Sequence, residues 1–253
     1  MASEPTFRPS ALIVFAHPEP TSFTAAMKDA AVRALEAADV NVEVSDLYGE
    51  GFNPVAGRHD FTTVADDSRF HYQTEQQHAW INDGYADDLQ REQQRVARAD
   101  MLVFVFPLWW GGIPAILKGW AERVFSYGFA YADGYRFDKG YFKGRRAAMG
   151  LATGGPKARF STGDVYGEIS LTLYPVIRAI EYMGLEVAEP FVAYAAPRVD
   201  DAGRAAYLAE WGDRLTALAS DPEWRAARAQ ERAAETGEKR AIDVPSNAWS
   251  MQR

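Results

Sequence analysis

The chain has 253 residues, which is enough for one large domain or two small ones. With 47% hydrophobic and 25% charged residues, its composition is that of a globular protein and excludes a disordered or low-complexity chain. The net charge of -8 argues against a general nucleic-acid or anionic-membrane binder, because either partner would repel such a surface.

The chain contains no cysteine, which excludes disulfides, thiolate metal sites, iron–sulfur clusters and a cysteine nucleophile. Its four histidines are too scattered for the close spacing of a zinc signature, so we expect no metal. The N-terminal residues lack the apolar run of a signal peptide, and no window approaches the roughly 20 apolar residues of a membrane span. We therefore expect a soluble, cytoplasmic protein with no membrane insertion and no nucleic-acid partner.

Short apolar segments alternate with longer amphipathic ones along most of the chain. Strands are predicted over residues 11–16, 40–46, 101–107, 147–152 and 185–194. Helices are predicted over residues 23–38, 115–125, 169–183 and 201–218. The fully apolar runs ALIVFA and MLVFVFP are typical of parallel strands that helices cover on both faces. The pattern predicts an α/β fold, an open, doubly wound five-stranded parallel sheet.

The pattern of strands and helices never restarts, so a single domain over residues 1–253 is predicted, with a core of about 11–218. Residues 48–90 hold many aromatic side chains without clear periodicity, and we expect so long a stretch to serve a site or an interface. Residues 219–253 form a charged, alanine-rich extension, which we expect to begin with a surface helix and to end in an arm.

The loop HPEPTSFT follows the first predicted strand, where open α/β sheets bind their ligands. It lacks the GxGxxG pattern of a dinucleotide-binding fingerprint. Thr21, Ser22 and Thr24 bracket the start of a helix, and their hydroxyls together with free backbone N–H groups are typical of a phosphate site. The alternative is that Thr21 or Ser22 only caps the helix.

Two further loops, PLWWGG and TGGP, follow two other predicted strands. Trp109 and Trp110 could flank a flat ring, with backbone amides of the glycine turn bonding to its edge. The alternative is that they pack in the core, and we expect one of the two to do so. Gly154 and Gly155 allow the backbone to approach a ligand closely, although such a pair is most often a simple turn. Three such loops at three strand ends favour a site for a flavin nucleotide.

These residues resemble the flavodoxin-like NAD(P)H:quinone oxidoreductases, the DT-diaphorase family and its bacterial relatives. The landmarks are AHPEPTSFT from Ala16, FPLWWGGIPAILKGWAERVF from Phe106, GFAY from Gly128, TGG from Thr153 and PVIRAIEYMGLEVAEP from Pro175. The resemblance covers about residues 11–218. It implies a flavodoxin-like fold and a flavoenzyme that takes hydride from NAD(P)H.

The resemblance also implies which residues hold the cofactor. The flavin phosphates would contact His17, Thr21, Ser22, Phe23 and Thr24, and the ring would contact Pro107, Leu108, Trp109, Trp110, Thr153, Gly154 and Gly155. Glu122 and Arg204 would lie by the adenosine half, which favours FAD, with FMN as the alternative.

The resemblance further implies a homodimer in which a neighbouring subunit closes the substrate pocket. Trp110 and Tyr131 would border the substrate. Residues 48–90 would build the dimer interface, with His71 at a flavin-contacting position.

The chain departs from the family at the pocket. The best-studied members have a tyrosine and, six residues later, a histidine after the glycine loop, where this chain has Phe160 and Tyr166. Tyr166 can donate a hydrogen bond but cannot carry the positive charge of an imidazolium. We predict that Tyr166 is catalytic, donating to the carbonyl edge of the flavin; the alternative is a packed aromatic. Gly111 leaves a wider pocket floor, so larger acceptors are expected to fit.

The leading hypothesis is a two-electron quinone reductase with a ping-pong mechanism. An azo or nitro reductase would use the same chemistry, and an ancillary regulatory subunit of a membrane transporter is a hypothesis of another class. A flavodoxin-type electron carrier is the least favoured, since Trp110 and Tyr131 would cover the flavin. Arg145 and Arg146 could select the 2′-phosphate of NADPH or could be solvated arginines at a strand end.

Overall fold

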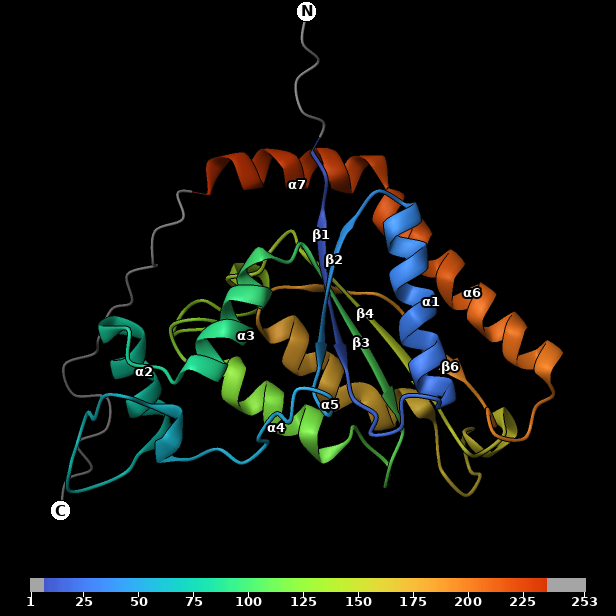
Figure 1. The fold of residues 1–253 in the computed structure, drawn as a ribbon, viewed down its shortest axis with the longest axis horizontal. Helices are drawn as coiled ribbons and strands as arrows, with labels where there is room; N and C mark the ends of the chain where they lie inside the picture. The colour runs from blue at the N-terminus through green and yellow to red at the C-terminus, as the bar shows by residue number, and fades with distance from the viewer. Residues whose placement is uncertain (1–6, 236–253) are drawn as a thin grey trace, which may run out of the picture.

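The computed structural model describes residues 7–235 and has three layers, with a central parallel sheet between two layers of helices (Figure 1). The strands are β1 Ser10–Phe15, β2 Asn41–Asp46, β3 Met101–Pro107, β4 Arg146–Ala152, β5 Glu186–Val187 and β6 Phe191–Ala193. The sheet order is β2-β1-β3-β4-β5, with β6 also paired to β4, and every pair is parallel. This order confirms the flavodoxin-like, doubly wound fold that the sequence predicted.

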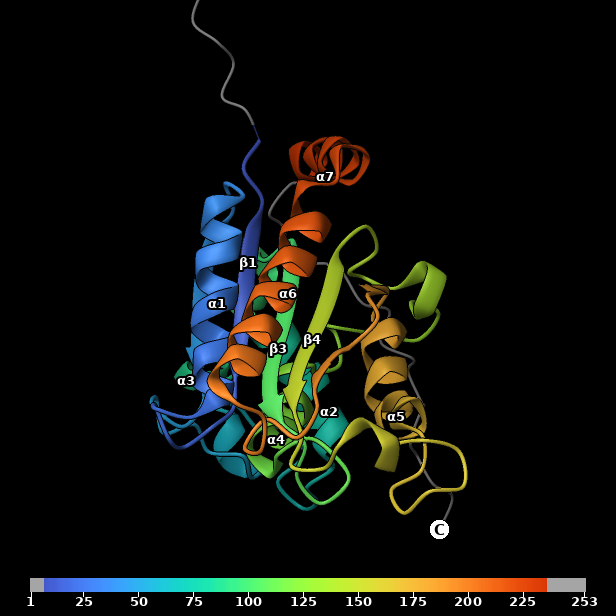
Figure 2. The same ribbon diagram turned by 90° about the vertical axis from the view of Figure 1, so that its right-hand side faces the viewer.

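Helices cover both faces of the sheet. They are α1 Phe23–Ala37, α2 Tyr72–Asn82, α3 Asp87–Arg98, α4 Ala115–Val124, α5 Ile169–Tyr182, α6 Asp201–Ser220 and α7 Pro222–Ala234, with 3₁₀ turns at Arg58–Asp60, Phe137–Lys139 and Lys157–Arg159. Helices α1 and α6 pack side by side on one face, while α3, α4 and α5 lie on the other (Figure 2). Among the described residues, no helix is long and apolar enough to cross a membrane.

Strand β3 shows why the chain forms two cores. All seven of its residues are buried. Met101, Val103 and Val105 pack under α1 and α6, whereas Leu102, Phe104 and Phe106 belong to the core on the opposite face. Successive side chains of a strand point to opposite faces, so an uninterrupted apolar run is required where both faces are covered.

The predicted fifth strand is wrong in its continuity. The run 185–194 forms two short strands, β5 and β6, and the break contains Pro190. Proline has no N–H to donate and therefore interrupts a ladder of hydrogen bonds.

The absence of periodicity predicted for residues 48–90 is also wrong in part, because α2 and the start of α3 lie there. Helix α3 buries Glu92 and Gln93 beside Leu89 and Val96, so half of its core-facing stripe is polar. The Glu92 carboxylate accepts hydrogen bonds from Ser45 Oγ at 2.7 Å and from an indole N–H. These partners lie far away in the sequence, so the local apolar pattern does not disclose them.

The extension after residue 218 continues α6 and then forms α7, which crosses the end of the sheet opposite the strand carboxyl ends (Figure 1). The prediction of a surface helix is incomplete, because Trp224 and Arg228 are buried. Arg228 Nε donates to Asp100 Oδ1 at 2.8 Å, and Trp224 Nε1 donates to the carbonyl of Gly144 at 3.0 Å. The predicted terminal arm, residues 242–253, lies outside the described residues.

Candidate functional site

The three predicted loops meet at the carboxyl edge of the sheet. Ala16 N donates to Val105 O at 3.0 Å, and Leu108 N, directly after Pro107, donates to Ala152 O at 2.9 Å. These bonds hold the ends of β1, β3 and β4 side by side. The rings of His17 and Trp109 lie 5.6 Å apart, so the first and second loops are in contact.

The first loop caps α1 and leaves donors free. Ser22 is the N-cap, and its Oγ accepts from Ala25 N at 3.1 Å, as the capping alternative requires. Among the described residues, no protein acceptor takes the N–H groups of Phe23 and Thr24. The first turn also has no acidic side chain. Capping and anion binding are therefore compatible, because the cap satisfies one donor and two remain at the positive end of the helix.

Thr21 is turned toward a carboxylate of its own loop. Its N–H and Oγ1 donate to Glu19 Oε1 at 2.9 and 2.7 Å, and these bonds lower the pKa of the exposed Glu19. His17 Nδ1 accepts from Glu19 N at 3.0 Å. Both donors of Thr21, its backbone N–H and its hydroxyl, are therefore bonded to a carboxylate oxygen of the same loop.

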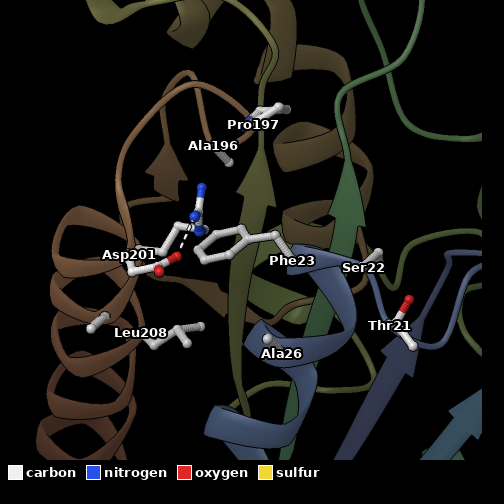
Figure 3. A pocket seen from close by; sticks show the side chains of 10 residues that line it. Thr21, Ser22, Phe23, Ala26, Ala196, Pro197, Asp201 and Leu208 are labelled. Atoms are coloured by element: carbon white, nitrogen blue, oxygen red, sulfur yellow. Dashed lines mark hydrogen bonds and ion pairs between the residues drawn. The ribbon is translucent and has the colours of Figure 1, made fainter.

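A cavity of about 560 Å³ begins at this loop and extends between α1 and α6 (Figure 3). Figure 3 shows the ring of Phe23 pointing from α1 toward Asp201 on α6. Asp201 forms an ion pair with Arg204, whose side chain also lines the cavity. The structure thus brings Thr21, Ser22 and Phe23 together with Arg204, as the sequence predicted.

The second loop is a tight turn that presents its tryptophans to solvent. Trp109 and Gly112 exchange backbone hydrogen bonds of 3.1 and 3.0 Å, and Trp110 and Gly111 between them have φ values of 49° and 69°. Positive φ at both central residues is the pattern of a type I′ turn. Trp110 is fully exposed and Trp109 is 39% exposed, so the alternative of core packing is wrong for both.

The third loop is held in place by the loop that follows β6. Buried Thr153 donates from Oγ1 to Gly155 O at 2.8 Å, and Ala196 N donates to Thr153 O at 3.0 Å. Within the described part of the chain, the N–H groups of Gly154 and Gly155 have no protein acceptor, and neither do those of Trp110 and Gly111. Free backbone donors therefore gather on all three loops.

Phe160 and Tyr166 form a tilted aromatic pair beside the third loop. Their ring centroids are 5.0 Å apart, and Phe160 also contacts Tyr194 at 5.6 Å. A Cβ at Gly155 would lie 2.9 Å from the Tyr166 ring, so the glycine lets the ring lie against the backbone. Tyr166 is 56% exposed, and its hydroxyl is free of protein partners among the described residues.

A second cavity, of about 800 Å³, opens between α4 and α5. Gly111 and Tyr131 both line it, which brings together two residues predicted to border the substrate. Tyr131 contacts the Tyr182 ring at a centroid distance of 5.5 Å, and burial raises the pKa of Tyr131. Most of the remaining lining is apolar, which suits a flat aromatic guest.

Two predicted cofactor residues lie elsewhere. Glu122 lines the second cavity and pairs with Lys118, so a single chain does not bring it to Arg204 around one adenosine. His71 caps α2, with its Nδ1 2.8 Å from Thr74 Oγ1. Figure 1 shows α2 at the opposite end of the long axis from the N-terminal end of α1.

The interpretation of Arg145 and Arg146 as selectors of a 2′-phosphate is wrong. Both lie at the amino end of β4, on the edge of the sheet away from the loops. Arg145 is buried and donates to carbonyls at the end of α3, including Val96 O at 3.1 Å. Arg146 pairs with Asp221 at 2.6 Å.

The loop after β6 also contributes to the site, although the sequence patterns did not point to it. Ala196, Pro197 and Asp201 line the first cavity, and Arg198 Nη1 donates to the carbonyl of Gly154. The rule that ligands bind at strand carboxyl ends applies to this loop as well. Applied to the fifth predicted strand, it would have found these residues.

Comparisons with known proteins agree with this architecture. A family model described as a flavodoxin-like fold, Flavodoxin_2, matches residues 9–215. The chain is 41% identical over 207 residues to NAD(P)H dehydrogenase [quinone] 1 of Cavia porcellus, covering 81% of this chain and 75% of the relative. It is 35% identical to the ribosyldihydronicotinamide dehydrogenase [quinone] of Pongo abelii, covering 82% and 90%. A solved quinone reductase structure from Klebsiella pneumoniae superposes with a TM-score of 0.79 at 33% identity, covering 83% and 85%.

Proposed function

This chain belongs to the flavodoxin-like fold family, and from that membership we propose that it is an NAD(P)H:quinone oxidoreductase that binds FAD. Its relatives make it an oxidoreductase of the NAD(P)H dehydrogenase (quinone) type. The observation that carries the proposal is the gathering of free backbone donors on three loops at one edge of the sheet. A flavin, when bound, would itself carry out the hydride and electron transfer from NAD(P)H to the acceptor. The proposal therefore requires no catalytic acid, base or nucleophile from the protein.

The residues fit a flavin. The free N–H groups of Phe23 and Thr24 stand at a helix N-terminus, which suits phosphate. The free N–H groups of Trp110, Gly111 and Gly154 stand beside two exposed indoles, which suits the polar edge and flat face of the ring system.

The first cavity favours FAD over FMN. It continues from the phosphate loop between α1 and α6 for about 560 Å³, and FMN has nothing beyond its phosphate to fill that space. An adenosine would lie against Phe23 and Arg204 there. Its ribose and base would replace the exposed ion pair of Arg204 with Asp201, whose strength in water is small.

The residues around the ring would orient both reaction partners in turn. Reductant and acceptor would occupy the same place above the ring, so the reductant must leave before the acceptor enters. The exposed Trp110 would cover the reacting face and exclude water, and Tyr166 would donate a hydrogen bond to the carbonyl edge. Phe160 holds the Tyr166 ring through a tilted ring contact, with the centroids 5.0 Å apart.

A second copy of the chain would complete the site. The second cavity is open, and exposed Leu171 and Tyr174 flank the part of its wall that α5 supplies. In a homodimer, Glu122 and His71 would contact the flavin of the partner, which accounts for their distance from Arg204 and α1 within one chain.

One experiment tests this function. The purified protein is heated to release its flavin, which is identified by chromatography, and the native protein is mixed anaerobically with NADPH or NADH. We expect FAD, rapid bleaching of the flavin absorbance, and re-oxidation by benzoquinone. A bound flavin that neither nucleotide reduces would overturn the reductase and favour a regulatory subunit. Faster re-oxidation by an azo dye than by any quinone would favour the azoreductase alternative.

Tyr166→Phe tests the hydrogen bond to the ring. We expect flavin reduction by NADPH to slow by about 10- to 100-fold, because one donor to the developing charge is lost while the ring contact stays. Stopped-flow absorbance measures the rate. Tyr135→Phe, which removes the hydroxyl of another exposed tyrosine away from the proposed site, is the matched control. Unchanged reduction in Tyr166→Phe would eliminate the catalytic role.

A further inference from the structure

Two cations beside the glycine loop have no carboxylate partner. Within residues 7–235, neither Arg198 nor Lys157 forms an ion pair, although the chain carries a net charge of -8. Both side chains are exposed, and each lies close in sequence to a residue that forms a ligand-facing loop. Two exposed cations that no carboxylate pairs, both close to the glycine loop, form a local surface that attracts anions.

The nearby carboxylates are already engaged. Asp164 pairs with Arg159 at 3.5 Å, Asp201 pairs with Arg204, and Asp200 accepts from Gly203 N at 2.8 Å as the N-cap of α6. Asp164 and Asp201 are thus paired with other arginines, and the described residues show no ion pair between Asp200 and Arg198.

The backbone holds Arg198 in place over the glycine loop. Its Nη1 donates to Gly154 O, and its loop is tied down by Ala195 N donating to Gly155 O at 2.9 Å. Ala195 has a φ of 51°, in the left-handed region that a residue with a side chain adopts only where its surroundings require it. The turn at Ala195 and the bond to Gly154 O together hold the Arg198 side chain beside the glycine loop.

We propose that Arg198, assisted by Lys157, binds the phosphate groups of the reductant, so that the enzyme selects phosphorylated dihydronicotinamides over uncharged ones. The proposal rests on the proposed function. A guanidinium can bind two phosphate oxygens in a bidentate geometry. The hydrogen bond to Gly154 O places the Arg198 guanidinium at the glycine loop, beside the proposed flavin ring, where the hydride donor must bind. The flavin phosphates have their own donors on the first loop, at Phe23 and Thr24.

The test compares hydride donors that share a reacting ring and differ in charge. Wild type, Arg198→Gln and Arg198→Lys are reduced anaerobically with NADPH, NADH and uncharged 1-methyl-1,4-dihydronicotinamide. We expect Arg198→Gln to lower kcat/KM for NADPH by about 10- to 100-fold through KM, the usual effect of losing a hydrogen bond to a charged group, and to leave the uncharged donor unaffected. Arg198→Lys should recover part of the loss, and Lys157→Gln should show a smaller loss of the same kind.

Two further readouts do not depend on turnover. The flavin content of Arg198→Gln should equal that of wild type, and titration with oxidised NADP⁺ should give a Kd raised by a similar factor. Arg33→Gln removes an equally exposed, unpaired arginine from α1 and should change neither readout.

Each other outcome overturns the proposal. An equal loss with all three donors would mean that Arg198 only supports the glycine loop, and a loss of flavin would assign it to the flavin phosphates. Unchanged constants with NADPH would remove it from phosphate binding. If no donor reduces the wild-type flavin, the proposed function itself fails, and this result is distinct from the others.

Discussion

Gly154 occupies the one position of the third loop where a methyl group can report on the flavin alone. A Cβ built there meets no heavy atom within 4 Å, and the backbone of Gly154 is not in the left-handed region. Alanine therefore suits the protein itself. We expect Gly154→Ala to change the free energy of unfolding of the flavin-free protein by less than about 0.5 kcal/mol, as for other surface substitutions.

The same methyl group would occupy the space above the loop where the proposed flavin ring lies. Forcing one extra carbon into a packed contact costs about 1–3 kcal/mol, which corresponds to flavin binding weaker by about 5- to 150-fold. The assay titrates flavin-free protein with FAD and follows the quenching of flavin fluorescence. Thermal unfolding of the same flavin-free samples measures stability.

Gly155→Ala is the matched comparison, because its methyl group would meet the protein instead. Its Cβ would lie 2.9 Å from Tyr166 and 3.1 Å from Phe160, so the aromatic pair must shift and the flavin-free protein should lose stability. If Gly154→Ala binds FAD as tightly as wild type, the ring does not lie over this loop and the reasoning is refuted. A loss of stability in flavin-free Gly154→Ala would show that the space is not open.

Two predictions concern α7. Arg228→Met should destabilise the protein by about 3 kcal/mol and lower Tm by roughly 6–12 °C in calorimetry, because Asp100, 1% exposed, loses the nearer of its two arginine partners, at 2.8 Å, and keeps only Arg232, at 3.3 Å. Arg214→Met, which breaks the exposed pair with Glu210, should cost less than about 1 kcal/mol. Burial would raise the pKa of Glu235, but hydrogen bonds from Arg228 and another arginine lower it to about 2. Because this folded pKa lies below the ordinary glutamate value of 4.5, the stabilisation is complete above pH 4.5 and lost as pH falls toward 2. Urea unfolding across that window should show a steeper loss in wild type than in Arg228→Met, and parallel curves would contradict the assignment.

The central strands could be predicted because their requirements are local. A strand buried on both faces must be apolar at every position, and β1 and β3 satisfy this in sequence. The start of α1 could be predicted for the same reason, since the Ser22 cap and the free N–H groups are properties of a helix start.

What could not be predicted depends on partners that are distant in the sequence. The core-facing side of α3 cannot be recognised from the sequence, because the polar Glu92 lies on it, buried against Ser45 and Trp120. The buried Arg123 pairs with Asp60 at 2.7 Å, and no local pattern marks either residue as internal. Asp60 and Glu92 are thus polar residues of the interior whose charges are satisfied by tertiary contacts.

The amino edge of the sheet contributes to stability, whereas the carboxyl edge leaves donors free for binding. At the amino edge, buried Asp100 receives Ser10 N at 2.8 Å and Arg228 at 2.8 Å, so the donors and acceptors there are satisfied by the protein. At the carboxyl edge, the loops are tied to the sheet through carbonyls and hydroxyls, while N–H groups such as those of Thr24 and Gly154 stay free. A bound cofactor can therefore accept hydrogen bonds from these N–H groups without breaking any bond that holds the fold. Binding should then raise Tm by mass action alone. The same division explains why Arg145 and Arg146 cannot take part in ligand recognition, although they are strand-end arginines: they lie at the amino edge, where Arg145 donates to carbonyls at the end of α3 and Arg146 pairs with Asp221.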